Sequence, residues 1–289
     1  MNLRLFIAAG ALLGAAISAS AADATPAGTA PAPAPANPDQ AIQTQLNVIV
    51  TRVKAKLANG EQSPAQLADD IKAFDDLAAA HRGEKTDAVA SVLYVEATLY
   101  WRVLQDYDHT AALLQQVKDD FPNTKYAPAA AKLLEGLQQE KQSMEIQASL
   151  KPGVMFPDFA EKDLSGQPLS VGRFKGKVVL VDFWATWCPP CRAELPNVVA
   201  AYQKYHDKGF EIVGVSLDKD ESQLKSFLAE HKMTWPQYFD GQYWQTKLAT
   251  KYGITSIPAT YLIGPDGKIV AKDLRGEALD QELGRLLAK

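Results

Sequence analysis

The most informative part of the sequence is Val181-Asp-Phe-Trp-Ala-Thr-Trp-Cys-Pro-Pro-Cys-Arg-Ala-Glu-Leu-Pro196. It begins inside an apolar run, residues 177–184, of the kind that forms a β-strand covered on both faces. A helix is expected over residues 190–207, so Cys188 and Cys191 lie where a strand leads into the N-terminus of a helix. Free N–H groups and the positive end of the helix dipole gather at such a point, and both favour a thiolate.

The spacing of the two cysteines suits thiol–disulfide exchange. With two residues between them, Cys188 is placed to attack a disulfide and Cys191 to attack the resulting mixed disulfide. Pro189 and Pro190 both lack an N–H group that would otherwise bond the Cys188 thiolate. We therefore expect a weakly stabilised thiolate and a reducing cysteine pair.

Other roles of a cysteine pair fit this sequence poorly. Haem attachment needs a histidine after the second cysteine, where this chain has Arg192. A structural disulfide across so short a loop would remove little chain entropy. A zinc site needs two further ligands, and the histidines show no paired spacing: His81, His109, His206 and His231. No metal site and no cofactor are expected.

The quoted stretch resembles the thioredoxin superfamily, and within it the exported TlpA/ResA-type branch, which is related to the redoxins. The resemblance runs from about Val154 to Lys289 and includes Pro157-Asp-Phe159, Phe174-Lys-Gly-Lys177 and Ser256-Ile-Pro258. It implies an α/β thioredoxin fold, in which helices flank a central mixed sheet. It also implies the activity of a thiol-disulfide oxidoreductase.

The resemblance assigns roles to further residues. Ile257 and Pro258 match the family's cis-proline loop, which lies against the cysteines and pairs with a bound substrate; a strand-initiating proline is the alternative. Asp182 matches the buried acid beneath the second cysteine, where a raised pKa would suit it to accept the Cys191 proton. Glu194 matches an active-site acid of the TlpA/ResA branch.

For both acids a purely structural role stays open. Asp182 would then only satisfy nearby backbone groups, and Glu194 would be a surface residue favoured in the first turns of a helix. Trp187 borders the exposed sulfur, and we expect it to contact the substrate.

The rest of the second half, residues 151–289, alternates strands and helices. The pattern predicts a strand at 210–217, a helix at 221–231, a short helix at 243–252, a hairpin of strands 259–263 and 268–271, and a helix at 277–287. A βαβ half followed by a ββα half predicts a mixed sheet with helices on both faces.

The N-terminus has the features of an export signal. Residues 1–21 combine Arg4, an apolar stretch over 5–17 and the small residues Ala19-Ser-Ala21. As a helix that stretch would rise only about 20 Å, too little to cross a bilayer. We expect a cleaved signal peptide and a periplasmic protein, with an uncleaved anchor as the alternative. Residues 22–39 read as a Pro/Ala-rich linker, either a semi-rigid spacer or filler without a role.

Residues 40–150 show apolar residues at helical spacing and predict an all-α domain of helical hairpins. Ser63 and Asp108 are expected to cap two of its helices. Leu93, Ala97, Tyr100 and Val103 have similar residues 34 positions later, which is the tetratricopeptide spacing. A generic antiparallel bundle is the alternative. We expect this domain to bind a protein or to dimerise, without chemistry of its own.

Composition agrees with this organisation. A chain of 289 residues is long enough for about two domains. Its formal net charge of −4 argues against nucleic-acid binding.

The sequence predicts a periplasmic reductant of specific protein disulfides, in the service of cytochrome c maturation or metal-centre assembly. Its partners would be a disulfide-containing client protein and a membrane electron donor of the DsbD/CcdA type.

Two other functions stay open. One is a helical scaffold or assembly protein with an incidental redox domain. The other is a redoxin-type peroxidase, although no Pro-xxx-Thr-xx-Cys arrangement surrounds Cys188.

Overall fold

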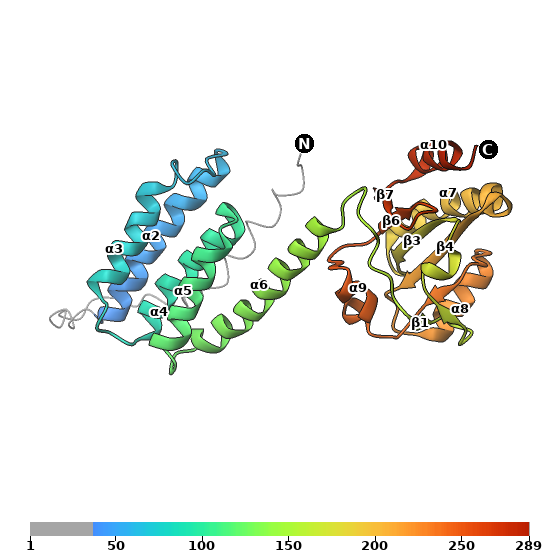
Figure 1. The fold of residues 1–289 in the computed structure, drawn as a ribbon. Coiled ribbons are helices and arrows are strands. Elements are labelled where there is room, and N and C mark those ends of the chain that lie inside the picture. Colours follow the sequence, from blue (N-terminus) through green and yellow to red (C-terminus); the bar gives the residue numbers. More distant parts are fainter. Residues whose placement is uncertain (1–36, 289) are drawn as a thin grey trace, which may run out of the picture. The chain divides into compact units, whose positions relative to one another are not determined.

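A computed structural model of the chain describes residues 37–288 (Figure 1). The predicted signal peptide, residues 1–21, and the predicted linker as far as residue 36 lie outside the described residues. The chain divides into two compact units, Met1–Gln139 and Glu140–Lys289. The division lies inside helix α6, Tyr126–Ser149, before the predicted domain boundary at residue 150. The end of α6 belongs to the second unit because Ile146 and Gln147 contact other residues of that unit.

The first unit is helical, as the sequence predicts. It comprises α2 (Pro38–Ala58), α3 (Ala68–Ala80), α4 (Asp87–Leu99), α5 (Tyr107–Asp120) and the start of α6. Helix α4 contacts α2, α3 and α5, and an apolar core fills the space between them. Within residues 37–288, no helix combines the length and the apolar character that crossing a membrane requires.

The starts of α2 and α5 differ from the predictions. Helix α2 begins at Pro38 with Asn37 as its cap, so the last residues of the predicted linker are helical. A proline fits this position because the first turn of a helix has no use for its missing N–H. Asp106, and not Asp108, caps α5, because the left-handed backbone of Gln105 ends the preceding turn two residues earlier than expected.

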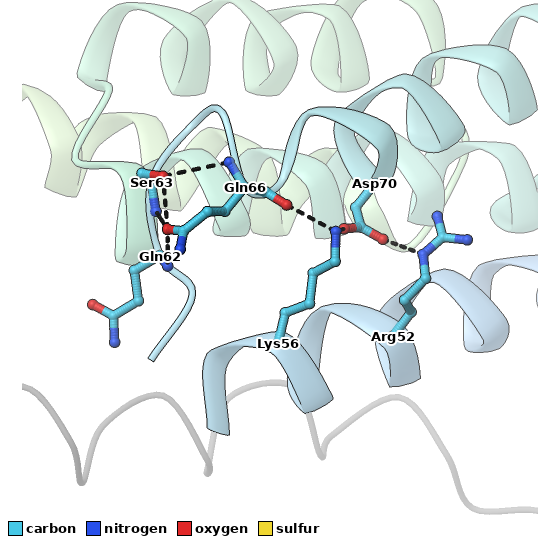
Figure 2. A network of polar contacts seen from close by, with 6 residues as sticks. All are labelled: Arg52, Lys56, Gln62, Ser63, Gln66 and Asp70. Carbon is cyan, nitrogen blue, oxygen red and sulfur yellow. Dashed lines mark hydrogen bonds and ion pairs between the residues drawn. The ribbon is translucent and has the colours of Figure 1, made fainter. Parts of the chain in front are cut away.

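A polar network joins α2 and α3 (Figure 2). The prediction that Ser63 caps α3 is wrong: Ser63 and Gln66 bond each other's side chain and backbone in a separate turn, and the helix begins only at Ala68, with Leu67 at its cap position. The Asp70 side chain is fully buried on α3 and accepts from Arg52 and, at 2.8 Å, from Lys56 of α2. Burial by itself raises the pKa of Asp70, but the hydrogen bonds and charges of Lys56 and Arg52 outweigh it and lower that pKa.

The second unit is built on a five-stranded mixed sheet. Its strand order is β5 (Gln237–Tyr238), β4 (Phe210–Ser216), β3 (Val178–Trp184), β6 (Ala259–Ile263) and β7 (Ile269–Lys272). Strand β3 pairs in parallel with β4 and antiparallel with β6. Every residue of β3 and β4 is buried, which explains their largely apolar sequence.

Alternation along β3 assigns side chains to the two faces of the sheet. Trp184 packs on Phe227 of α8 (Glu221–Glu230), and Asp182 lies near Cys191 of α7 (Pro189–Tyr205). Phe183 points the other way, toward Tyr252, directly after α9 (Lys247–Lys251). Helix α10 (Gly276–Leu287) contacts α7. Helices therefore flank both faces, and the predicted thioredoxin fold is confirmed.

The sequence pattern did not predict some elements of the second unit and predicted one helix to be too long. The strands β1 (Glu161–Lys162), β2 (Pro168–Leu169) and β5 have only two residues each, too few to show a period. The helix predicted over 243–252 is wrong in its first half, where a 3-10 turn at Tyr243–Gln245 precedes α9. Asp240 separates the two by accepting from the N–H groups of Gln242 and Lys247.

Candidate active site

The two cysteines lie at the start of α7, a few residues after the end of β3. Cys188 is the N-cap of the helix, and its sulfur accepts a hydrogen bond from the Cys191 N–H at 3.2 Å. The two sulfurs form a disulfide, with Cα atoms 5.3 Å apart. Both residues are nearly buried, with 3% of Cys188 and 6% of Cys191 exposed. The predicted strand-to-helix placement of the pair is therefore what the structure shows.

The loop before Cys188 is fixed by a buried carboxylate that the sequence did not reveal. Asp218, two residues after the end of β4, accepts from the Thr186 N–H at 3.2 Å and from the Thr186 hydroxyl at 2.6 Å. The Ser216 hydroxyl donates to its other oxygen at 2.8 Å. These bonds hold the backbone two residues before the reactive sulfur.

The loop of Ile257 and Pro258 faces the cysteine pair, as the resemblance implies. The peptide bond between these residues is cis. The carbonyl oxygen of Ile257 lies 3.7 Å from the Cys188 sulfur. Because a disulfide sulfur has no proton to donate, this is a packing contact, and it places the backbone of the loop beside the sulfur.

A small cavity lies behind Cys191, lined by residues of β3, α7, β6 and the start of α10. Its volume is about 20 Å³, enough for one water molecule. Polar and ionisable residues in its lining are Asp182, Cys191, Glu194, Thr260 and Arg275. The structure thus brings Cys191 together with both acids that the sequence singled out.

Asp182 has the environment of a proton acceptor. Asp182 is 8% exposed, and its pKa is raised to about 7. Burial is the main cause, the nearby negative charge of Glu194 adds to the rise, and the positive charge of Arg275 opposes it. A carboxyl group with such a pKa can hold or release a proton at neutral pH.

Glu194 is partly exposed and more constrained. One of its oxygens accepts from the Gly276 N–H at 2.6 Å, at the start of α10, and the other accepts from the Asn197 side chain at 3.2 Å. Arg275, the cap residue of α10, donates to the Pro258 carbonyl at 2.9 Å. Sequence reasoning missed Arg275 and Thr260, because neither belongs to a motif and the fold alone brings them to the cavity.

Trp187 forms part of an aromatic surface beside the cysteines. It is 40% exposed, and its ring lies 4.9 Å from that of Tyr243 and 5.9 Å from that of Trp244. The Lys219 ammonium lies 4.7 Å from the centre of the Tyr243 ring. Tyr243 and Trp244 come from the segment drawn as a helix in the sequence, which is why their role in this surface was missed.

A groove runs along α7 next to this surface. Its volume is about 680 Å³, and it starts at Pro189, directly after Cys188. Apolar and polar residues of α7 between Pro189 and Gln203 form one wall, and Phe227 and His231 of the α8 region form the other. The Arg192 guanidinium lies 5.9 Å from the centre of the Phe227 ring. A polypeptide could therefore approach Cys188 along a surface with both apolar and basic character.

The second half of the chain is similar to known redox proteins. Residues 152–272 match the AhpC/TSA family. The thiol-disulfide oxidoreductase ResA of Bacillus cereus is 33% identical over 157 residues, which span 54% of this chain and 85% of ResA. The thioredoxin-like protein YneN of Bacillus subtilis is 36% identical over 126 residues, 43% of this chain and 71% of YneN.

Solved structures also match part of the chain. The thioredoxin domain of a thiol-disulfide oxidoreductase from Bacteroides vulgatus is 39% identical, with a TM-score of 0.44, over 48% of this chain and 99% of that domain. A thiol:disulfide interchange protein from a Bacteroides species is also 39% identical, with a TM-score of 0.44, over 49% of this chain and 93% of that protein.

Proposed function

Because the chain belongs to the family of thiol-disulfide oxidoreductases that includes ResA, we propose that it works in the periplasm as a reductant of specific protein disulfides. The observation that carries the proposal is the cysteine pair at the N-terminus of α7, with Asp182 at a cavity behind Cys191. Such a site can both attack a disulfide and supply a base for releasing the product.

The exchange follows from this arrangement. In the reduced protein the Cys188 thiolate attacks one sulfur of a client disulfide, forms a mixed disulfide and displaces the other client sulfur as a thiolate. Asp182 then takes the proton of the Cys191 thiol, through a water molecule in the cavity. The Cys191 thiolate attacks the Cys188 sulfur and displaces the second client thiolate. The client gains two electrons, and the protein is left with the disulfide between Cys188 and Cys191.

A trapping experiment tests this proposal. A Cys191→Ser variant, expressed in the native cell envelope, should accumulate a client protein bound to Cys188 as a mixed disulfide, because the resolving thiol is missing. The trapped protein would be identified by mass spectrometry after reduction. Recovery no greater than with a Cys188→Ser control would count against an oxidoreductase role.

The same variants address the alternative of a scaffold protein. If a Cys188→Ser, Cys191→Ser double variant supported the cellular function as well as the native chain, the helical unit would be the working part. Loss of that function with normal folding would instead favour the redox role.

Export is a further part of the proposal. It is supported by the apolar N-terminal segment and by the Ala19-Ser-Ala21 site in the sequence. Mass spectrometry of the protein isolated from the envelope should find a mature chain that starts at Ala22.

The proposed cycle also requires two partners. An oxidising compartment cannot keep the cysteine pair reduced, so a membrane thiol donor of the DsbD/CcdA type must reduce it again. The substrate would be a client protein on the route to cytochrome c or to a metal centre.

A further inference from the structure

Arg275 occupies a junction between the three parts of the candidate active site. It follows β7 and caps α10, and its guanidinium donates to the Pro258 carbonyl at 2.9 Å. The next residue, Gly276, donates its N–H to Glu194 at 2.6 Å. One short segment thus binds both the loop that faces Cys188 and an acid that faces Cys191.

The charge of Arg275 is also distinctive at this place. The ionisable groups that line the cavity behind Cys191 are Asp182 of β3, Cys191 and Glu194 of α7, and Arg275. Among these lining residues Arg275 alone is a cation. The Asp182 and Glu194 carboxylates repel each other, and both repel the thiolate that forms at Cys191. A neighbouring guanidinium offsets this repulsion.

We propose that Arg275 is a positioning residue for thiol–disulfide exchange, which anchors the Ile257–Pro258 loop and keeps Asp182 ionised beside Glu194 until it accepts the Cys191 proton. The inference rests on the proposed function, since it assigns a part of that reaction to a residue outside the motif.

Two consequences separate its roles. As an anchor, the guanidinium holds the backbone that a client strand would pair with, and its loss should weaken client binding. As a cation, it lowers the pKa of Asp182, and its loss should move the pH dependence of the Cys191 step upward. If Arg275 served only to stabilise the fold, its loss would change neither client binding nor the pH dependence of the Cys191 step in a protein that remains folded.

The test compares three substitutions at this site with a matched control. Arg275→Lys retains the charge, Arg275→Gln retains a hydrogen-bond donor without the charge, and Arg275→Met retains neither. Arg285→Met is the control, because Arg285 is an exposed arginine on the same helix that pairs with Glu282. Each reduced protein is mixed with a small peptide disulfide, and the attack and release phases are followed by stopped flow from pH 5 to 9.

We expect the midpoint of the release phase to rise by about half a pH unit in Arg275→Met and Arg275→Gln, since an exposed cation acts through partly screened solvent. This makes release about twofold slower at pH 7. Arg275→Lys should keep the native midpoint. The KM for the peptide should rise severalfold in Arg275→Met, less in Arg275→Gln, and remain native in Arg285→Met.

Profiles of Arg275→Met and Arg285→Met that coincide in both midpoint and KM would overturn the inference. That failure is distinct from failure of the proposed function, in which the native protein itself would show no exchange with the peptide. Thermal unfolding of each variant, measured in parallel, identifies any change that comes from loss of folding.

Discussion

At the scale of single residues, the most consequential group is the carboxyl of Asp182. It lies in the middle of a fully buried strand, yet at neutral pH it is divided between its neutral and ionised forms, because its pKa is about 7. A group of this kind is useful for proton transfer and costly for stability. Its two effects can be measured independently.

Because burying the ionised carboxylate of Asp182 costs stability, we predict that Asp182→Asn stabilises the oxidised protein at alkaline pH. With a folded-state pKa near 7 and an ordinary pKa of 3.8 for an unfolded chain, Asp182 makes no contribution below pH 3.8 and destabilises the fold progressively up to about pH 7. The full difference is on the order of 4 kcal/mol at pH 8. Urea unfolding at pH 4 and pH 8 should show the gain only at pH 8.

The exposed residue Asp207 provides the control for this measurement. Asp207→Asn should change the free energy of unfolding little at either pH. A gain in Asp182→Asn of equal size at pH 4 and pH 8 would contradict ionisation as its cause. The same variant should slow release of a mixed disulfide at pH 7 by about a hundredfold, since it has no base for the Cys191 proton.

Glu194 predicts a pH effect of the opposite sign to that of Arg275. Its negative charge raises the pKa of Asp182, so Glu194→Gln should lower the midpoint of the release phase. A shift of a few tenths of a pH unit downward is expected, because Glu194 is partly exposed. If the release phase instead vanished at every pH, Glu194 itself would be the proton acceptor.

The site residues found in the sequence share one property: each belongs to a motif. Cys188 and Cys191 are defined by their spacing and by the helix that follows, and Asp182 and Glu194 by their positions relative to them. Asp218 and Arg275 carry no such label. They reach the site because β4 and β7 end at the same edge of the sheet as β3, and this arrangement of strands comes from the tertiary fold.

At the scale of elements, Gly214 shows how closely the sheet is packed behind the site. It lies in the centre of β4, opposite Asp182 of β3. A Cβ atom at Gly214 would lie 2.0 Å from the side-chain oxygen of Gln237, which accepts from the Trp184 indole at 3.0 Å. Gln237 is 3% exposed, so its side chain has little room to move.

Gly214→Ala is therefore expected to destabilise the protein by about 1–3 kcal/mol, because the Gln237 side chain must leave its place and Trp184 loses its hydrogen bond. Gly136→Ala is the matched control. Gly136 lies in α6 with nothing within 4 Å of the added Cβ, and alanine there should stabilise by about 0.5–1 kcal/mol. Urea unfolding should give changes of opposite sign, and two equal losses would contradict the packing argument.

The length of an element decided how well the sequence predicted it. The strands at β3, β4 and β6 and the helices α7, α8 and α10 were placed within one or two residues, because each has a clear period or a clear cap. The two-residue strands have neither. The turn at Tyr243–Gln245 was taken for helix because its apolar residues fit a helical stripe, while the bonds of Asp240 that break it involve only backbone N–H groups.

At the scale of the whole molecule, the helical unit is held by polar contacts as well as by its core. Asp70→Asn should destabilise this unit by about 1–3 kcal/mol at pH 7, since the buried side chain would lose its ion pairs with Arg52 and Lys56. Because the pKa of Asp70 is lowered, the stabilisation is present above about pH 4 and is lost as the pH falls further. Unfolding followed by circular dichroism at pH 7 and pH 3 measures the difference.

Asp76→Asn on the same helix is the control, because Asp76 forms an exposed ion pair with Lys72 that should contribute less than 1 kcal/mol. Both variants should reduce a small peptide disulfide at the native rate, since the redox residues all lie in the second unit. Loss of client trapping when Asp70→Asn is added to the Cys191→Ser variant, while Asp70→Asn alone still reduces the peptide, would assign client recognition to the helical unit. An effect of Asp76→Asn as large as that of Asp70→Asn would contradict the role of burial.

The hydrogen bond from the Cys191 N–H to the Cys188 sulfur makes one amide an NMR reporter of the active site. Since both intervening residues are prolines, the Cys191 amide is the first after Cys188 to give a cross-peak in a nitrogen–proton correlation spectrum. A hydrogen bond to a charged acceptor is shorter and stronger, so this cross-peak should move when the thiol ionises. Titration of the reduced protein should thus read the Cys188 pKa from one peak. A midpoint near ~4 would contradict the weakly stabilised thiolate that the two prolines predict, whereas a midpoint near neutrality would agree with it.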